Sequence, residues 1–291
     1  MQKHKNFEEF YNTVKTLVWR HMPQRTQDEK KGGHDIDNIQ HIFVLRHGRR
    51  ADDDSDSRVF IWRPWDPPLS GRGRQQIYEQ GAVIQSIMEQ ERKSITRIVS
   101  SPFTRCLQTS DVLAKRFKIR ECIKIDEGVG ELMSDEVISQ RKTEQNEIQK
   151  QGLVLHPSEV IFPNCFATTS SPTLKVPANQ LETDDHDGAG YSRFRNSITR
   201  IADEDPTQNI VIVTHGDGVA AAVNLPLPGV VVYNTKYGGF VHLIRDRSVS
   251  EEPSWKIGDK SDTHGVIWGR GYAARGVGIP EPKEKRTLTS F

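Results

Sequence analysis

Two histidines of this chain follow short apolar runs, at the points where buried strands should end. The run IFVL at 42–45 leads into Arg46 and His47, and the run IVIV at 210–213 leads into His215. A neutral imidazole can attack phosphorus and form a covalent intermediate, and a guanidinium presents a planar fork of donors that matches phosphate oxygens. These residue types therefore indicate phosphoryl transfer, provided that the strand ends meet in the fold.

A third apolar run supplies a further cation. Residues 95–101 are typical of a strand, and Arg105 stands in the helix that we expect over 103–117. If the three strands are parallel, their carboxyl ends lie on one edge of the sheet, which is where open α/β sheets bind ligands. The helices that begin near Phe103 and after Gly216 would add amino-terminal amides that point at an anion. A carboxylic acid is also required, because the leaving oxygen must be protonated.

Strands that alternate with helices place the chain in the α/β class. Residues 69–90 predict a helix that begins at about residue 71 and is capped by Ser70. Its apolar face would be formed by Ile77, Gly81, Ile84 and Met88. A short helix of small residues, VAAAVNL, follows the last of the three strands. This order of elements favours a mostly parallel central sheet.

Composition argues against several classes of protein. The 291 residues carry 40 Lys and Arg against 39 Asp and Glu, so the net charge of +1 gives no general attraction to nucleic acid or to an anionic membrane. No apolar run approaches the roughly 20 residues that cross a bilayer. Cys106, Cys122 and Cys165 are too few and too scattered for a disulfide framework. Since the first residues also lack an apolar signal core, we expect a cytoplasmic protein.

Four segments differ from the core pattern. Residues 7–18 place apolar side chains at helical spacing, and this amphipathic helix either packs on the body of the protein or binds a protein partner or a second copy of the chain. Residues 23–38 are interpreted as a linker, and the proline-containing polar stretch 140–190 as an insertion over the site. In the last stretch, Trp255 and Trp268 either fold the tail back onto the body or stand in a flexible segment, and this tail is a second place where a protein partner or another copy of the chain could bind.

The motifs at the strand ends resemble those of the histidine phosphatase superfamily, also called phosphoglycerate mutase-like. Five of them occur in the family's order between about residues 41 and 245: LRHGRR, PPLSGRGRQQ, SSPFTRCLQTS, GVGEL and VTHGDGV. The resemblance implies a three-layer α/β/α sandwich with a mostly parallel central sheet. It divides the chain into an N-terminal helix and linker at 1–38, a histidine phosphatase domain at 39–246 that contains the insertion, and a C-terminal tail at 247–291.

The family's roles carry over to the positions that match its motifs. The resemblance implies that His47 is the nucleophile that becomes phosphohistidine. It implies that Arg46, Arg105 and His215 contact the oxygens of the phosphoryl group. These four side chains would therefore bind the phosphorylated substrate and transfer its phosphoryl group.

The resemblance assigns the general acid to Glu131, which stands 26 positions past Arg105. Asp217 is the alternative acid. The acid phosphatase branch of the family places its acid directly after the second histidine, where this chain has Gly216, and Asp217 is one position further on.

Arg50 stands three positions past His47 and is not shared by the whole family. It resembles the phosphatase domain of the suppressor of T-cell receptor signalling proteins, in which an arginine at this place lines the phosphate site. The run RPWDPP at 63–68 is similar to that branch too. Mutases of the family usually have Glu or Gln directly after RHG, whereas this chain has Arg49. The pattern therefore favours a phosphatase over a phosphoglycerate-type mutase, with either a phosphoprotein or a small phosphorylated metabolite as substrate.

Other kinds of chemistry fit the sequence less well. A cysteine phosphatase needs an arginine six positions after its cysteine, and those positions hold Val112, Gly128 and Ser171. Four aspartates near the first motif are interpreted as a charged loop beside the site rather than as metal ligands: Asp52, Asp53, Asp54 and Asp56. We expect neither a metal nor a cofactor. The fold also serves as a non-catalytic interaction subunit in some assemblies, and the intact set of phosphate-binding residues favours the enzyme.

Overall fold

The computed structural model describes residues 38–55, 66–132, 153–155, 166–167, 174–176, 189–247, 254–258 and 264–270. The chain divides into two units, Met1–Asn38 and Ile39–Phe291, and the elements described below belong to the second. The helix predicted over 7–18, the linker and most of the expected insertion lie outside the described residues. Within the insertion, the structure describes β5 (Phe166–Ala167) and a two-stranded antiparallel sheet of β4 (Leu153–Leu155) and β6 (Leu174–Val176).

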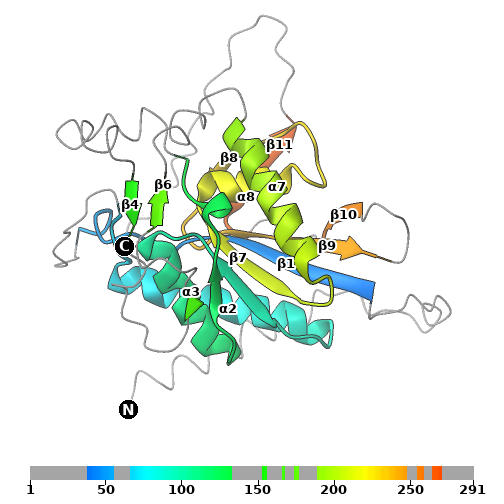
Figure 1. Ribbon diagram of the computed structural model, residues 1–291, viewed down its shortest axis with the longest axis horizontal. Coiled ribbons are helices and arrows are strands. Elements are labelled where there is room, and N and C mark those ends of the chain that lie inside the picture. The colour runs from blue at the N-terminus through cyan, green and yellow to red at the C-terminus, as the bar shows by residue number, and fades with distance from the viewer. Residues whose placement is uncertain are drawn as a thin grey trace, which may run out of the picture. The chain divides into compact units, whose positions relative to one another are not determined.

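A mixed sheet forms the centre of the described fold (Figure 1). Its spatial order is β10 (Ser254–Ile257), β9 (Phe240–Asp246), β1 (Ile39–Arg46), β7 (Ile210–Thr214), β2 (Arg97–Ser100), β3 (Ile123–Ile125) and β5. The pairs from β1 through β5 are parallel, and β9 pairs antiparallel with both β1 and β10. The predicted α/β class with a mostly parallel sheet is confirmed.

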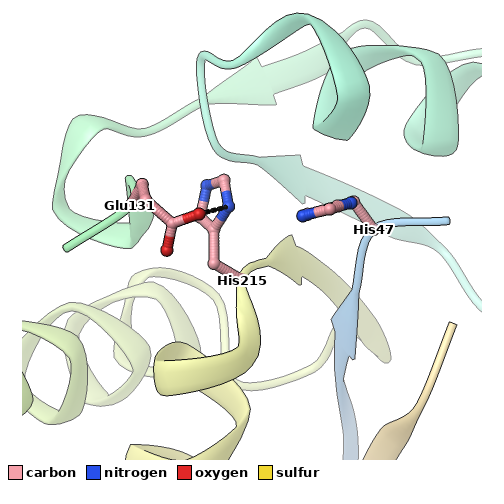
Figure 2. A group of neighbouring side chains, drawn as sticks. All are labelled: His47, Glu131 and His215. Carbon is pink, nitrogen blue, oxygen red and sulfur yellow. Dashed lines mark ion pairs between the residues drawn. The ribbon is translucent and has the colours of Figure 1, made fainter. Parts of the chain in front are cut away.

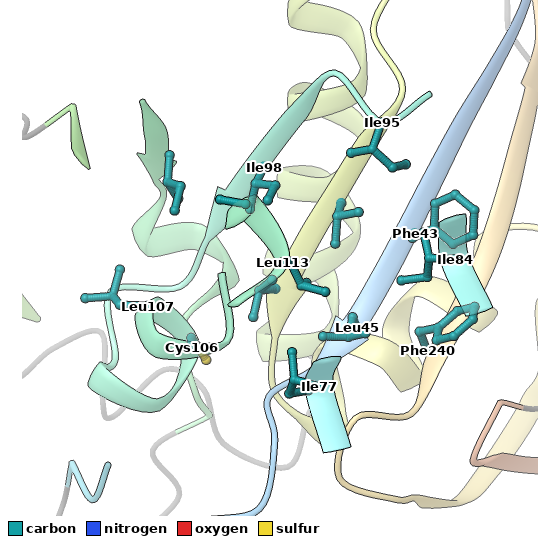
Figure 3. Packing of buried hydrophobic residues seen from close by; sticks show 14 of the residues in the cluster. Phe43, Leu45, Ile77, Ile84, Ile95, Ile98, Cys106, Leu107, Leu113 and Phe240 are labelled. Atoms are coloured by element: carbon teal, nitrogen blue, oxygen red, sulfur yellow. The ribbon is translucent and has the colours of Figure 1, made fainter. Parts of the chain in front are cut away.

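Helices cover both faces of this sheet, which gives the three layers that we expected. On one face lie α2 (Gly71–Gln90) and α3 (Thr104–Phe117), and on the other lie α7 (Ala189–Glu204) and α8 (Gly216–Val223). Side chains of β1 alternate between the two resulting cores: Phe43 and Leu45 contact the first (Figure 3), and Ile42 and Val44 contact the second. All four side chains are fully buried, and each stabilises the fold by about 1.5–3 kcal/mol.

The strand register brings the two histidine motifs together. Leu45 lies opposite Val213, and Arg46 lies opposite Thr214, so the residues that follow leave the sheet side by side. The backbone N–H of His47 continues the ladder by donating to the carbonyl of Thr214 at 3.0 Å. Two segments more than 160 positions apart thus deliver their histidines to the same edge.

Helix α2 begins where the sequence indicates. The Ser70 hydroxyl accepts a hydrogen bond from the N–H of Gly73 at 3.0 Å, and the predicted apolar face is the buried one. Gly48 and Gly73 let the loop after β1 approach this helix. A Cβ on Gly48 would lie 2.7 Å from the Gly73 carbonyl oxygen, and a Cβ on Gly73 would lie 2.2 Å from the Arg49 carbonyl oxygen. The glycine of the RHG motif is therefore required for contact with α2.

The two tryptophans after residue 246 fold back onto the protein. Trp255 in β10 and Trp268 in β11 (Val266–Arg270) are partly buried against the second core. β11 pairs antiparallel with β8 (Val230–Thr235) in a sheet of two strands, and a 3₁₀ turn, η3 (Glu127–Val129), follows β3. None of the helices in the described part of the chain is long and apolar enough to cross a membrane.

The contact between Gly73 and the loop of His47 predicts a difference between two neighbouring glycines of α2. Replacing Gly73 with alanine forces the new methyl group into the backbone of Arg49 and should lower the free energy of unfolding by about 1–3 kcal/mol. Gly71→Ala is the matched control, because a Cβ at Gly71 has no neighbour within 4 Å. Urea unfolding of both variants checks this, and equal stabilities would contradict the described packing.

Candidate active site

The hydrogen bonds of the His47 ring fit a neutral imidazole that can act as a nucleophile. Its side chain is buried, and its Nδ1 lies 2.8 Å from the Gly48 carbonyl oxygen, which can only accept a hydrogen bond. Nδ1 therefore carries the proton, and the lone pair on Nε2 faces the guanidinium of Arg105, whose Nε donates to it at 3.1 Å. The following N–H, on Gly48, donates to the Thr109 hydroxyl at 3.1 Å, which fixes the turn.

The Arg105 guanidinium is the hub of the site. One terminal nitrogen donates to Glu131 Oε2 at 3.0 Å and lies 3.3 Å from Nδ1 of His215. The other is buried and has no hydrogen-bond partner among the described residues, although it lies 3.6 Å from a carboxylate oxygen of Asp66. This arrangement leaves a donor within the cluster for an incoming phosphoryl oxygen.

His215 faces Glu131 across a short contact. Its Nδ1 lies 2.8 Å from Glu131 Oε2 (Figure 2), and its Nε2 lies 2.8 Å from the Ser101 hydroxyl. A neutral imidazole satisfies both contacts when Nδ1 donates to the carboxylate and Nε2 accepts from the hydroxyl. The rings of His47 and His215 are 5.3 Å apart between centroids, so one phosphoryl group can contact both.

Burial and the charge of Arg105 set the protonation of the cluster. They hold the pKa of His47 well below its ordinary value, and burial, with Arg105 acting in the same direction, lowers the pKa of His215 to about 4. Burial alone would raise the pKa of Glu131, yet the interaction with His215 and the charge of Arg105 keep it below its ordinary range. Both histidines are therefore neutral and Glu131 is ionised before substrate binds.

Asp217, the alternative acid, lies in the first turn of α8. The Tyr191 hydroxyl donates to its Oδ1 at 3.0 Å. Burial and the nearby charge of Glu131 raise the pKa of Asp217, so this carboxyl group holds a proton more readily than an exposed aspartate. The pKa of Glu131 is thus below its ordinary value, and the pKa of Asp217 is above its ordinary value.

Arg46 lies beside the cluster and is held by the end of β8. One terminal nitrogen donates to the carbonyl of Thr235, and its guanidinium lies over the ring of Tyr237, 4.1 Å from the centroid. Its Nε is buried and has no hydrogen-bond partner among the described residues. The Tyr237 ring is also 5.5 Å from the ring of His47, which places Arg46 and Tyr237 on the same side of the nucleophile.

Arg50 is directed toward the aspartate cluster. Two of its three guanidinium nitrogens, Nε and one terminal nitrogen, bind the carboxylate of Asp52, and both side chains are partly buried. Asp53 accepts a hydrogen bond from the Tyr237 hydroxyl, and Asp54 lies 3.6 Å from Arg72. These three acids therefore face arginines and a phenol, and Asp56 lies outside the described residues.

Asp66 and Tyr237 are two neighbours of the site that we did not identify from the sequence. The Asp66 carboxylate accepts hydrogen bonds from the N–H and the hydroxyl of Thr104, at 2.8 Å and 2.6 Å, and so anchors the start of the helix that carries Arg105. Asp66 belongs to the run RPWDPP, which was the available signal. No local pattern indicated Tyr237, because it reaches His47 only through the fold.

Three ligand-type atoms of His47, Glu131 and His215 lie within 4.8 Å of one another, a set that could in principle hold a metal ion. The Arg105 guanidinium, however, donates to His47 and to Glu131 from within this cluster. A dication would have to displace that cation and meet its charge at close range. The donor set therefore suits an anion better than a metal.

Burial of neutral His215 predicts that acid destabilises the fold. The pKa of His215 is about 4 in the folded protein and 6.5 in the reference state, so the unfolded chain takes up a proton first as the pH falls. The free energy of unfolding should decrease from about pH 6.5 to about pH 4, and His215→Gln should lose less over this window. Urea unfolding at about pH 7 and about pH 5 measures both slopes, and parallel slopes would rule out this contribution.

Comparison with known proteins agrees with this geometry. The family model described as histidine phosphatase superfamily (branch 1) matches residues 42–155, which include His47, Arg105 and Glu131. The phosphoglycerate mutase-like protein 4 of Arabidopsis thaliana is 25% identical over 193 residues, which are 65% of this chain and 72% of that protein.

Solved structures similar to this chain include a mycobacterial glucosyl-3-phosphoglycerate phosphatase, with 16% identity, a TM-score of 0.44, and coverage of 75% of this chain and 97% of that one. A phosphoglycerate mutase from Bacillus anthracis has 15% identity and a TM-score of 0.46, over 79% and 96% of the two chains. Over residues 42–155 the chain is thus similar to the histidine phosphatase superfamily, branch 1, and over 193 residues to the relative in Arabidopsis.

Proposed function

We propose that this protein is a phosphatase that hydrolyses phosphomonoesters through a phosphohistidine formed on His47. The observation that carries the proposal is the state of His47: its Nδ1 is bound to the Gly48 carbonyl, and the lone pair on Nε2 is directed into a cluster of cationic and neutral donors. Attack by Nε2 forms the N–P bond and breaks the bond between phosphorus and the leaving oxygen. Water then attacks phosphorus, the N–P bond breaks and inorganic phosphate leaves.

Arg46, Arg105 and His215 would stabilise the charge on the transferring group. The unsatisfied terminal nitrogen of Arg105 and the buried Nε of Arg46 supply donors that the described residues leave unused. Binding of a phosphoryl dianion also neutralises part of the positive charge that keeps Glu131 ionised. Glu131 then gains a proton more readily, and this is how we expect it to become the general acid that protonates the leaving oxygen.

The choice of phosphatase over mutase rests on the sequence after RHG, where Arg49 and Arg50 replace the acidic or amide side chain usual in mutases. The resemblance to the suppressor of T-cell receptor signalling proteins implies that Arg50 lines the phosphate site. To do so, Arg50 would have to release Asp52 and bind the substrate instead. The names of the similar proteins include mutases and phosphatases alike. We further propose a cytoplasmic location and catalysis without a cofactor.

Hydrolysis of p-nitrophenyl phosphate tests the proposal. The wild-type protein should release nitrophenol between about pH 4 and about pH 8, with EDTA present throughout, and His47→Ala should lower kcat by about a thousandfold or more. Acid-labile, base-stable labelling of the wild type by a ³²P-phosphoester would identify the phosphohistidine. Absence of turnover over this pH range would favour the non-catalytic interaction subunit, and loss of turnover in EDTA would contradict a metal-free mechanism.

A comparison of substrates whose leaving groups differ in their need for a proton identifies the general acid. A nitrophenolate leaves with little help from a proton, whereas an alkoxide must be protonated. If Glu131 is the acid, Glu131→Gln should lower kcat for an alkyl phosphate by about 10²–10⁴-fold and affect p-nitrophenyl phosphate much less. Asp217→Asn serves as the comparison, and the same leaving-group dependence in that variant instead would assign the acid to Asp217.

A further inference from the structure

The loop that carries Glu131 is bonded through its backbone to an arginine of α7. One terminal nitrogen of Arg193 donates to the carbonyls of Gly128 and Gly130, at 2.9 Å and 3.2 Å. The other terminal nitrogen donates to the carbonyl of Glu131 itself, at 3.4 Å. One guanidinium therefore binds three of the four backbone carbonyls between residues 128 and 131, including that of the candidate acid.

Two further contacts hold the same loop. The Thr214 hydroxyl, at the end of β7, donates to the remaining carbonyl, that of Val129, at 2.7 Å. A Cβ on Gly128 would lie 2.1 Å from the hydroxyl oxygen of Ser197, so the loop packs closely against α7. The loop is thus held between α7 and the strand that delivers His215 to the site.

A general acid needs a fixed place, because it must lie within hydrogen-bond reach of the leaving oxygen. Before substrate binds, the Glu131 carboxylate contacts Arg105 and His215. In the proposed reaction both of these partners turn to the phosphoryl group, so they cannot be the only groups that hold the acid. The contacts of Arg193 are made to the backbone of the loop, and they do not compete with the phosphoryl group for donors.

We propose that Arg193 is a positioning residue for the proton transfer, which holds the backbone of Glu131 so that the carboxyl group reaches the leaving oxygen. The inference rests on the proposed phosphatase function and on Glu131 as its general acid. Arg193 acts through the loop and not on the phosphoryl group. A guanidinium suits this role, because its planar fork donates to several acceptors at once.

Two substrates measure this role: n-propyl phosphate, whose alkoxide must be protonated, and p-nitrophenyl phosphate, whose leaving group needs little help. Arg193→Met should lower kcat for propyl phosphate by about 10–100-fold, and kcat for p-nitrophenyl phosphate by less than about threefold. Arg193→Lys should recover part of the loss, because an ammonium still donates to some of these carbonyls. Beside Glu131→Gln, Arg193→Met should cause no further loss with propyl phosphate, since the two residues act as one unit.

Arg195→Met is the matched control, because this arginine of the same helix donates at 3.0 Å to the hydroxyl of Ser192, also on α7. It should leave kcat for both substrates unchanged. An equal loss with both substrates in Arg193→Met, or a loss that persists beside Glu131→Gln, would overturn the inference, since a weakened fold does not distinguish leaving groups. So would assignment of the acid to Asp217. If Arg193→Met does not fold, Arg193→Lys replaces it in every measurement.

Amide hydrogen exchange separates this inference from the proposed function. The N–H of Gly130 donates to the carbonyl of Glu127 at 2.9 Å and so reports whether the loop is held. Its exchange should be about tenfold faster in Arg193→Met than in wild type or Arg195→Met. If wild type proves inactive, the phosphatase function fails, and faster exchange leaves the anchoring by Arg193 standing whereas unchanged exchange removes it too. If wild type is active, the leaving-group test decides, and a negative result there removes the positioning role alone.

Discussion

The described site depends on one buried cation, the guanidinium of Arg105. It is 3% exposed and contacts His47, Glu131 and His215, which come from three different parts of the chain. A buried charge is costly unless partners surround it, so the fold must deliver these groups to one place. The anchoring of Thr104 by Asp66 meets part of this requirement, because it fixes the turn from which Arg105 projects.

The same charge explains why two histidines and a carboxylate can share so small a space. Two protonated imidazoles beside a guanidinium would repel it, and burial disfavours them further, so both rings are neutral. The Glu131 carboxylate is ionised because the interaction with His215 and the positive charge of Arg105 stabilise its negative charge against the effect of burial. In the proposed reaction, a phosphoryl dianion enters a site that carries fixed positive charge. The lone pair on His47 Nε2, which accepts from Arg105 before substrate binds, then attacks phosphorus.

Close backbone contacts fix the loop of His47 against α2 and against the turn after β8. The loop after β1 lies against α2 through Gly48 and Gly73, and the turn after β8 lies against it through the hydrogen bond between Gly238 and His47. These contacts bring the side chains of Arg49, Lys236 and Tyr237 to a cationic cavity beside the nucleophile. The turn of His47 and the cationic cavity are therefore held together by the same backbone contacts.

The central elements could be located from the sequence alone. Their apolar patterns and capping residues are local, so β1, β7, β2, α2 and α3 could be located, and the family motifs selected His47, Arg105, Glu131 and His215 as the cluster, whose catalytic roles stay predictions. Side-chain partners that lie far apart in the chain could be identified only in the fold. Asp66 reaches Thr104 across 38 positions, and Gln76 reaches Tyr237 across 161. Such contacts leave no periodicity in the chain, because they arise from where the folded elements end.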